Sequence, residues 1–254
     1  MKRIHFYKAL PFLFVSALII SACSKEVELP DPSQLPVEET SAYPPVVRLR
    51  ANRIKGPCTG TFVSPIAILT AAHCFPPGTR GIQVDSDQVR GTADFIEGMT
   101  PALPGENPHD LALLKLNENP VSEFYRIGKQ VDEGNLVRLV GYGHFRNSRD
   151  HLKRTGTNVV SQISEFIEIN FADPISPPMI SANLRGAINR AGGTEGDSGG
   201  ALLKFEANQF WLVGVIQSRD PHGPITYNVN LTTPDNRAFI QSINGKYQLE
   251  IPAF

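Results

Sequence analysis

The chain has 254 residues, of which 41% are hydrophobic and 19% are charged, and its formal net charge is −1. That length suits one large domain or two small lobes with ordinary hydrophobic cores. A net charge so close to zero argues against a nucleic-acid-binding protein, which usually carries a basic excess or a basic stripe.

The first part of the chain has the pattern of a bacterial export signal. A short basic region precedes residues 9–22, which are apolar but too few for an ordinary bilayer span. The sequence ISAC, ending at Cys23, resembles a bacterial lipobox, in which the cysteine is lipidated and becomes the first residue. We therefore expect a lipoprotein signal peptide at 1–22 and lipidation of Cys23. The alternatives are a plain secretory signal with an incidental cysteine and an uncleaved membrane anchor.

A polar, acidic and proline-containing segment follows the signal at residues 23–42. Such a composition cannot bury enough apolar surface to fold, so we expect a flexible tether. Together, signal and tether predict an exported, membrane-anchored lipoprotein. By analogy with Gram-negative lipoproteins, Ser24 favours the outer membrane, and the periplasmic and surface faces both stay open.

The three cysteines of the chain are Cys23, Cys58 and Cys74. If Cys23 carries lipid, two remain, and an oxidising compartment allows them to pair. We predict a Cys58–Cys74 disulfide, with two free buried thiols as the alternative.

From about Tyr43 onward, short strand-like runs alternate with turns, in a chain with 21 glycines and 21 prolines. The expected strands lie at 46–50, 60–64, 67–72, 110–116, 135–143, 166–171, 201–205 and 210–218. The best helix candidate is 232–243, where Pro234 and Asp235 precede apolar residues at helical spacing. This pattern predicts a β-barrel or sandwich with one terminal helix.

A glycine-rich turn around Ser198 suits a reactive hydroxyl. Gly196, Gly199 and Gly200 allow the backbone to turn sharply and to point its amides at a substrate. A serine nucleophile also needs a base, usually a histidine, and a carboxylate that orients the base. Of the six histidines, His73 alone follows a strand-like run of small and apolar residues.

Three segments resemble the signature segments of trypsin/chymotrypsin-like serine proteases: LTAAHC (69–74), DLALLKL (110–116) and GDSGG (196–200). They occur in the order of that family, with histidine first, then aspartate, then serine. The likeness extends over about residues 43–243, and three ordered motifs beside a cysteine pair are a specific signal.

This resemblance implies a role for each motif residue. Ser198 would be the nucleophile, His73 the general base and acid, and Asp110 the carboxylate that orients the imidazole. The amides of Gly196 and Ser198 would form the oxyanion hole. The predicted disulfide would clamp the loop that carries the histidine.

The resemblance also implies the fold. We expect an all-β protein of two antiparallel six-stranded β-barrels with a C-terminal helix. The protease domain would span residues 43–254, with lobes at about 43–128 and 135–243.

Asp197 departs from the family pattern. In activated members, the aspartate before the serine pairs with a newly cut α-ammonium that begins Ile/Val-Val-Gly-Gly, and no such tetrapeptide occurs here. A buried carboxylate without a partner is costly, so an atypical new terminus or an internal group must replace the ammonium. His144 is a candidate for that group, with a plain surface histidine as the alternative. We expect the uncut chain to be zymogen-like.

The specificity pocket departs as well. Trypsin-like enzymes carry an aspartate six residues before the nucleophile, where this chain has Gly192, so cleavage after Lys or Arg is not expected. The substrate-pairing strand reads Gln217-Ser218-Arg219, where the family usually has Ser-Trp-Gly. Arg219 would either narrow the pocket or bind an acidic side chain.

The residues together predict an exported, lipid-anchored serine endopeptidase that works through a Ser-His-Asp triad and an acyl-enzyme. We expect a monomer that acts on peptide or protein substrates, with no cofactor and no nucleic-acid partner. Acidic residues at 84–87 and Glu97 are better explained as surface charges than as a calcium loop, and no metal site is expected. The alternative is a catalytically silent, protease-like lipoprotein that binds partners, because a fold does not fix a function.

Overall fold

The computed structural model describes residues 38–51, 56–86, 89–99, 108–144, 152–171 and 192–254. The predicted signal peptide, Cys23 and most of the predicted tether lie outside these ranges. None of the helices within them is long and apolar enough to cross a membrane.

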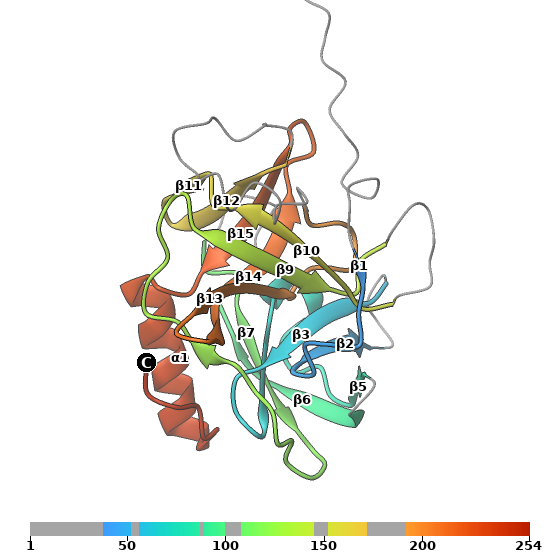
Figure 1. Cartoon of the computed structure of the whole chain (residues 1–254). Helices are drawn as coiled ribbons and strands as arrows, with labels where there is room; N and C mark the ends of the chain where they lie inside the picture. The colour runs from blue at the N-terminus through green and yellow to red at the C-terminus, as the bar shows by residue number, and fades with distance from the viewer. Residues whose placement is uncertain (1–37, 52–55, 87–88, 100–107, 145–151, 172–191) are drawn as a thin grey trace, which may run out of the picture.

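The amino-terminal unit is a closed six-stranded barrel (Figure 1). Around the ring, its strands are β2 (Val46–Arg50), β3 (Cys58–Phe62), β4 (Ala67–Thr70), β7 (Ala112–Leu116), β6 (Arg90–Gly98) and β5 (Ile82–Asp85). All neighbours are antiparallel, and apolar side chains such as Phe62, Leu49 and Leu114 fill the interior. The first barrel thus matches the expected one in strand number and direction.

The second unit is a curled sheet of nine strands. Its main path runs through β1 (Glu38–Glu39), β10 (Arg154–Val159), β9 (Leu136–Gly141), β13 (Ala201–Glu206), β14 (Gln209–Arg219), β15 (Ile225–Asn230), β12 (Phe166–Asn170) and β11 (Gln162–Ile163). The short strand β8 (Arg126–Ile127) pairs in parallel with β14.

This second unit differs in detail from the expected closed six-stranded barrel. Within the described residues no ladder joins β10 to β12, and the two strands meet through a side-chain bond from Asn158 Nδ2 to Asn170 O at 3.5 Å. The sheet is therefore a half-barrel that carries extra short strands at its edges. The all-β fold class with one C-terminal helix is confirmed.

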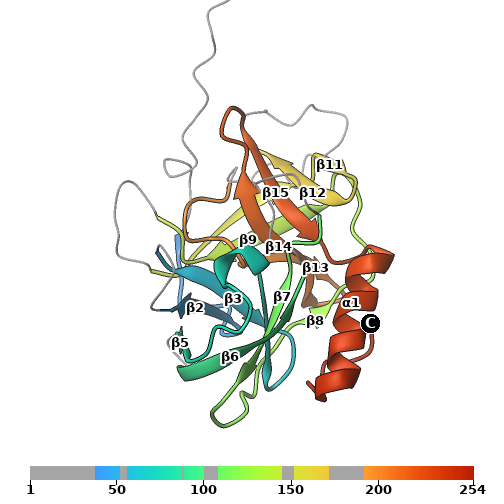
Figure 2. The ribbon, with the colours of Figure 1, turned by 180° about the vertical axis from the view of Figure 1, so that it is seen from behind.

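The helix α1 (Pro234–Tyr247) is the last element along the chain, and both views place it on the flank of the molecule (Figures 1 and 2). It begins at Thr233, whose hydroxyl accepts a bond from the Asn236 amide, an ordinary N-cap. Ile240 and Ile243 are buried on its inner face.

One apolar cluster joins the two units. It combines Leu69 and Leu113 of the first barrel with Val140 and Val215 of the second sheet, and it includes Ile240 of the helix. Because this core is shared, the facing loops of the two units are held in a fixed relation at the seam between them.

Candidate active site

His73 and Asp110 lie together at the end of the first barrel. His73 is in a short 3-10 helix (Ala72–Cys74), and Asp110 precedes β7. The Asp110 carboxylate accepts two bonds from His73, from the ring atom Nδ1 at 2.6 Å and from the backbone N at 2.8 Å. The Asp110 side chain is fully buried, whereas the imidazole is one-third exposed. This arrangement leaves Nε2 as the histidine nitrogen that can accept a proton.

A disulfide fixes the histidine segment. Cys58 in β3 and Cys74 beside His73 are bonded, with their Cα atoms 6.3 Å apart, so the predicted pairing is confirmed. The bridge ties the 3-10 helix to a barrel strand on the same side as the seam.

The turn that carries Ser198 requires glycine at two positions. Gly196 and Gly199 have φ of +98° and +85°, in the left-handed region that other residues rarely adopt. A Cβ on Gly199 would also overlap the carbonyl oxygen of Thr59 and the hydroxyl of Thr70. The turn is therefore pressed directly against β3 and β4 of the first barrel.

This contact brings Ser198 to the histidine. The Ser198 carbonyl accepts a bond from Thr59 N at 2.8 Å. Cys74 Sγ lies 3.8 Å from the same carbonyl oxygen and 3.9 Å from His73 Nε2. The Ser198 hydroxyl itself donates to the Gln217 carbonyl at 3.1 Å. A rotation of this side chain would be needed to direct the hydroxyl towards His73, as is common before substrate binds.

The amides of the turn divide into two groups. Those of Gly193, Thr194, Asp197, Gly199 and Gly200 all donate to protein acceptors. Those of Glu195, Gly196 and Ser198 donate to no acceptor in the described part of the chain. Two of these three belong to Ser198 itself and to Gly196, two positions before it, and two such amides are what a developing oxyanion requires.

Asp197 is held by neighbours within the chain. Its carboxylate accepts bonds from Gly143 N at 2.7 Å, from Thr194 N at 2.9 Å and from Thr194 Oγ1 at 3.1 Å. Burial raises the pKa of this carboxyl, and the bonds from Thr194 and Gly143, with the positive charge of Arg154, lower it in part. The His144 ring, the partner considered from the sequence, instead lies 3.9 Å from the Glu195 carboxylate.

The three predicted pocket residues lie in different settings. Gln217 is buried at a register shift of β14, where its carbonyl faces Ser198. Arg219 is exposed at the end of the same strand. Gly192 packs against the ring of the buried Phe171, which lies 2.7 Å from where a Cβ would stand. An aromatic ring therefore occupies the space beside Gly192. None of the three predicted pocket residues supplies an acidic group there.

Two supporting residues were missed from the sequence. Thr59 donates its hydroxyl to Gly196 O at 2.8 Å and accepts from Tyr142 N at 3.1 Å, so one side chain of the first barrel holds two segments of the second unit. Asn236 of α1 bonds to Pro108 O at 3.2 Å and to His109 Nδ1 at 2.9 Å, next to Asp110. Both contacts join residues more than 80 positions apart, so no local pattern marks them.

Two of the acidic residues considered for calcium take part in ion pairs, and the third, Asp87, lies outside the described residues. Asp85 pairs with Arg48 and Arg90, and Glu97 pairs with Lys246 at 3.3 Å. No group of three or more potential metal ligands occurs in the ranges that the structure covers.

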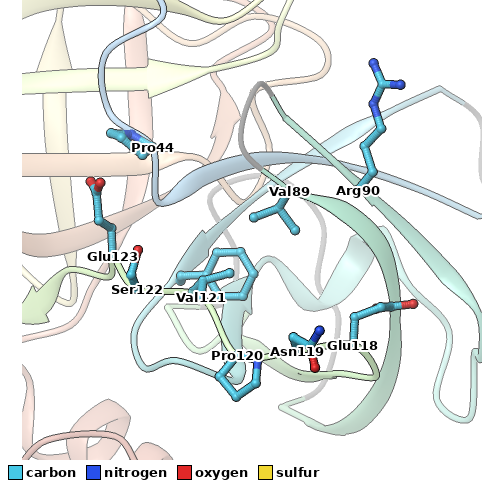
Figure 3. A pocket seen from close by; sticks show the side chains of 10 residues that line it. Pro44, Val89, Arg90, Glu118, Asn119, Pro120, Val121, Ser122 and Glu123 are labelled. Carbon is cyan, nitrogen blue, oxygen red and sulfur yellow. The ribbon is translucent and has the colours of Figure 1, made fainter.

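A separate hollow of about 440 Å³ lies on the first barrel (Figure 3). Its lining includes Pro44, Val121, Arg90 and Glu123, and it contains none of the residues discussed above for catalysis.

Comparison with known proteins places this geometry in a family. The sequence profile described as Trypsin matches residues 36–234 of the chain. A solved structure titled "Structure of Glu endopeptidase in complex with MPD" superposes with a TM-score of 0.58 and 18% sequence identity, covering 82% of this chain and 96% of that one. At that identity the likeness shows the fold alone.

Curated relatives are more similar in sequence but cover less. Two peptidases of Corynebacterium glutamicum, one named as putative and one as uncharacterized, are 28% identical over 159 residues, or 62% of this chain and 52% of each relative. Kallikrein-4 of Homo sapiens is 31% identical over 161 residues, or 58% of this chain and 62% of the relative. The chain thus spans about half the length of the Corynebacterium relatives that it matches.

Proposed function

The chain belongs to the trypsin family, and from this premise we propose that it is a serine endopeptidase with Ser198 as its nucleophile. The observation that carries the proposal is the pair of bonds between His73 and the buried Asp110, formed beside the turn of Ser198. The relatives named as peptidases support the same reaction class.

The chemistry follows from the arrangement of the three side chains. His73 Nε2 takes the proton of the Ser198 hydroxyl as its oxygen attacks the carbonyl carbon of the scissile bond. Asp110 keeps the proton on Nδ1 and stabilises the imidazolium that forms. The amides of Gly196 and Ser198 bind the developing oxyanion. His73 then protonates the leaving amine and activates water, which hydrolyses the acyl-enzyme.

We propose that the substrates are peptides or proteins whose side chain before the scissile bond is neither Lys nor Arg. The support is Gly192, which replaces the acidic anchor of trypsin-like pockets and packs against Phe171. The exposed Arg219 at the end of β14 adds a positive charge where such a substrate would pair. A cleavage profile on a peptide library tests this point, and preferred cleavage after Lys or Arg would contradict it.

We also propose that the protein is exported and held at a membrane, most simply the outer membrane, by lipid on Cys23. The support is the sequence alone, with its short apolar signal and ISAC pattern. The catalytic unit would then act as a monomer on its tether.

A fluorophosphonate probe tests the catalytic proposal, because it reacts only with an activated serine in an ordered oxyanion hole. We expect the full chain to be labelled, and we expect Ser198→Ala and His73→Ala to abolish labelling. Folding of each variant is checked by circular dichroism. If the wild type and both variants all stay unlabelled, before and after proteolysis of residues 23–42, the catalytic proposal fails and the silent binding protein takes its place.

A further inference from the structure

Asp197 raises a question that the catalytic proposal leaves open. Asp197 stands between Gly196 and Ser198 in the chain, and its carboxylate turns away from them to Gly143 and Thr194, so its placement helps to set the shape of that turn. A buried carboxylate is costly unless donors and positive charge compensate it.

Thr194 supplies two of the compensating bonds. Its backbone N lies 2.9 Å and its hydroxyl 3.1 Å from Asp197 Oδ2. The hydroxyl is also 3.0 Å from His144 O, but it has one proton, and a charged acceptor forms the stronger bond. Thr194 therefore holds the carboxylate from within the turn itself.

The end of β9 is shaped to accept the same carboxylate. Gly143 N donates to Oδ1 at 2.7 Å, and a Cβ on either Gly141 or Gly143 would overlap the carboxylate. Because Gly141 and Gly143 have no Cβ, they leave space for the Asp197 carboxylate, which the side chain of any other residue would fill. The carboxylate thus has a built site in the chain as it stands.

Arg154 brings positive charge to this site. It is buried in β10, opposite Gly141 of β9, and its Nη1 lies 3.4 Å from Gly143 O. Arg154 and Asp197 line one cavity of about 30 Å³. The strand β1 pairs with β10 at Arg154. The positive charge also lowers the pKa of Asp197 against the effect of burial.

We propose that Thr194 and Arg154 are positioning residues that hold the oxyanion turn in its working form in the uncut chain, so that activity needs no newly cut α-ammonium. This inference rests on the proposed serine-protease function. It replaces the zymogen-like state expected from the sequence.

The first test uses the full chain. Wild-type protein is labelled with a fluorophosphonate, and the amino terminus of the labelled species is determined by sequencing. We expect labelled chains that still carry the whole tether sequence from 23 to 42. Labelling confined to chains cut within that segment would overturn the inference but support the catalytic proposal. Failure to label any species would instead reject the catalytic proposal.

The second test uses matched side-chain variants. Thr194→Val and Arg154→Met remove the hydroxyl and the charge at nearly constant shape, and we expect each to lower the rate of labelling about tenfold or more. Thr194→Ser and Arg154→Lys should restore most of the rate. Thr61→Val is the control, since the buried Thr61 hydroxyl makes no bond to a described residue and lies in the first barrel.

The pH profile separates positioning from simple loss of stability. Thr194→Val removes a donor to Asp197, which raises the pKa of that carboxyl, so the acid limb of the labelling rate should move to higher pH. Thr194→Ser restores the hydroxyl donor, so it should return the acid limb of the labelling rate to its wild-type position. If Thr194→Val and Arg154→Met are folded, and both react within twofold of wild type with unchanged acid limbs, the inference is wrong. If either variant is too unstable to assay, its Ser or Lys counterpart and the sequencing test decide.

Discussion

The carboxylate of Asp110 holds His73 at two points, with one oxygen on the ring Nδ1 and the other on the backbone N. The ring bond selects the tautomer that leaves Nε2 free to accept a proton. The backbone bond fixes where the ring stands. One side chain thus sets both the tautomer and the position of the imidazole.

Asp110→Asn separates these two roles. The amide can retain one of the bonds, but it cannot accept from both donors as the carboxylate does and it loses the charge that stabilises the imidazolium. We expect kcat to fall by roughly 10³- to 10⁴-fold with little change in thermal stability. Steady-state kinetics on a peptide ester measures this, and a loss smaller than tenfold would contradict the proposed role of Asp110.

Thr59→Val should loosen the seam between the two units. The change leaves Gly196 O without its donor and Tyr142 N without its acceptor, and each lost bond to a buried group costs about 1–3 kcal/mol. We expect a lower free energy of unfolding and slower labelling of Ser198, measured by urea denaturation and by the fluorophosphonate assay. Thr61→Val, two positions along the same strand, removes a buried hydroxyl without a described partner, so it should keep or raise the free energy of unfolding and leave the labelling rate unchanged.

Gly199→Ala should be severely destabilising. The new Cβ would overlap the Thr59 carbonyl and would sit on a residue with φ of +85°. We expect a loss of several kcal/mol or failure to fold, seen as loss of the cooperative urea transition. The matched control is Gly245→Ala in α1, where a Cβ meets nothing within 4 Å and helix propensity predicts a gain of about 0.5–1 kcal/mol. Equal effects at the two glycines would refute this reading of the turn.

The Cys58–Cys74 disulfide should contribute measurably to stability. It closes a loop with a sequence separation of 16, for which chain entropy predicts about 3 kcal/mol. Cys58→Ala/Cys74→Ala should therefore unfold at lower urea concentration than wild type under oxidising conditions. Adding a reductant should bring wild type to the level of the variant, and a reductant effect on the variant itself would show that another process is involved.

Cys23→Ser tests the proposed anchor. Without a thiol no lipid can be attached, so incorporation of radiolabelled palmitate should disappear while Ser198 remains reactive. Cys74→Ser, which removes a thiol outside the ISAC pattern, should retain the label. Palmitate in the Cys23→Ser protein would rule out this attachment site.

The strands with strong apolar patterns could be predicted closely. The expected run 46–50 coincides with β2, and 201–205 differs from β13 by one residue. In contrast, β10 has the sequence RTGTNV, all of it buried, and periodicity misses it because these polar residues are buried by their neighbours in the fold: β9 along the whole strand, and β1 at Arg154 and Thr155. Periodicity cannot detect a strand whose burial depends on distant partners.

The candidate site shows the same division. The motifs located His73, Asp110 and Ser198, because the spacing of these residues to glycines and cysteines is local. The donors of Asp197 could not be found in this way. Gly143 lies 54 positions away, and Thr194 is close in sequence but acts through a bend that only the folded turn creates.

The placement of the helix α1 has a consequence for a chain that is still being made. Asn236 fastens the segment before Asp110, although more than 120 positions separate the two along the chain. Ser198 likewise reaches His73 only across the seam. If the proposed function holds, a nascent chain has no assembled catalytic group until α1 has been made, and until then it does not digest itself or its neighbours.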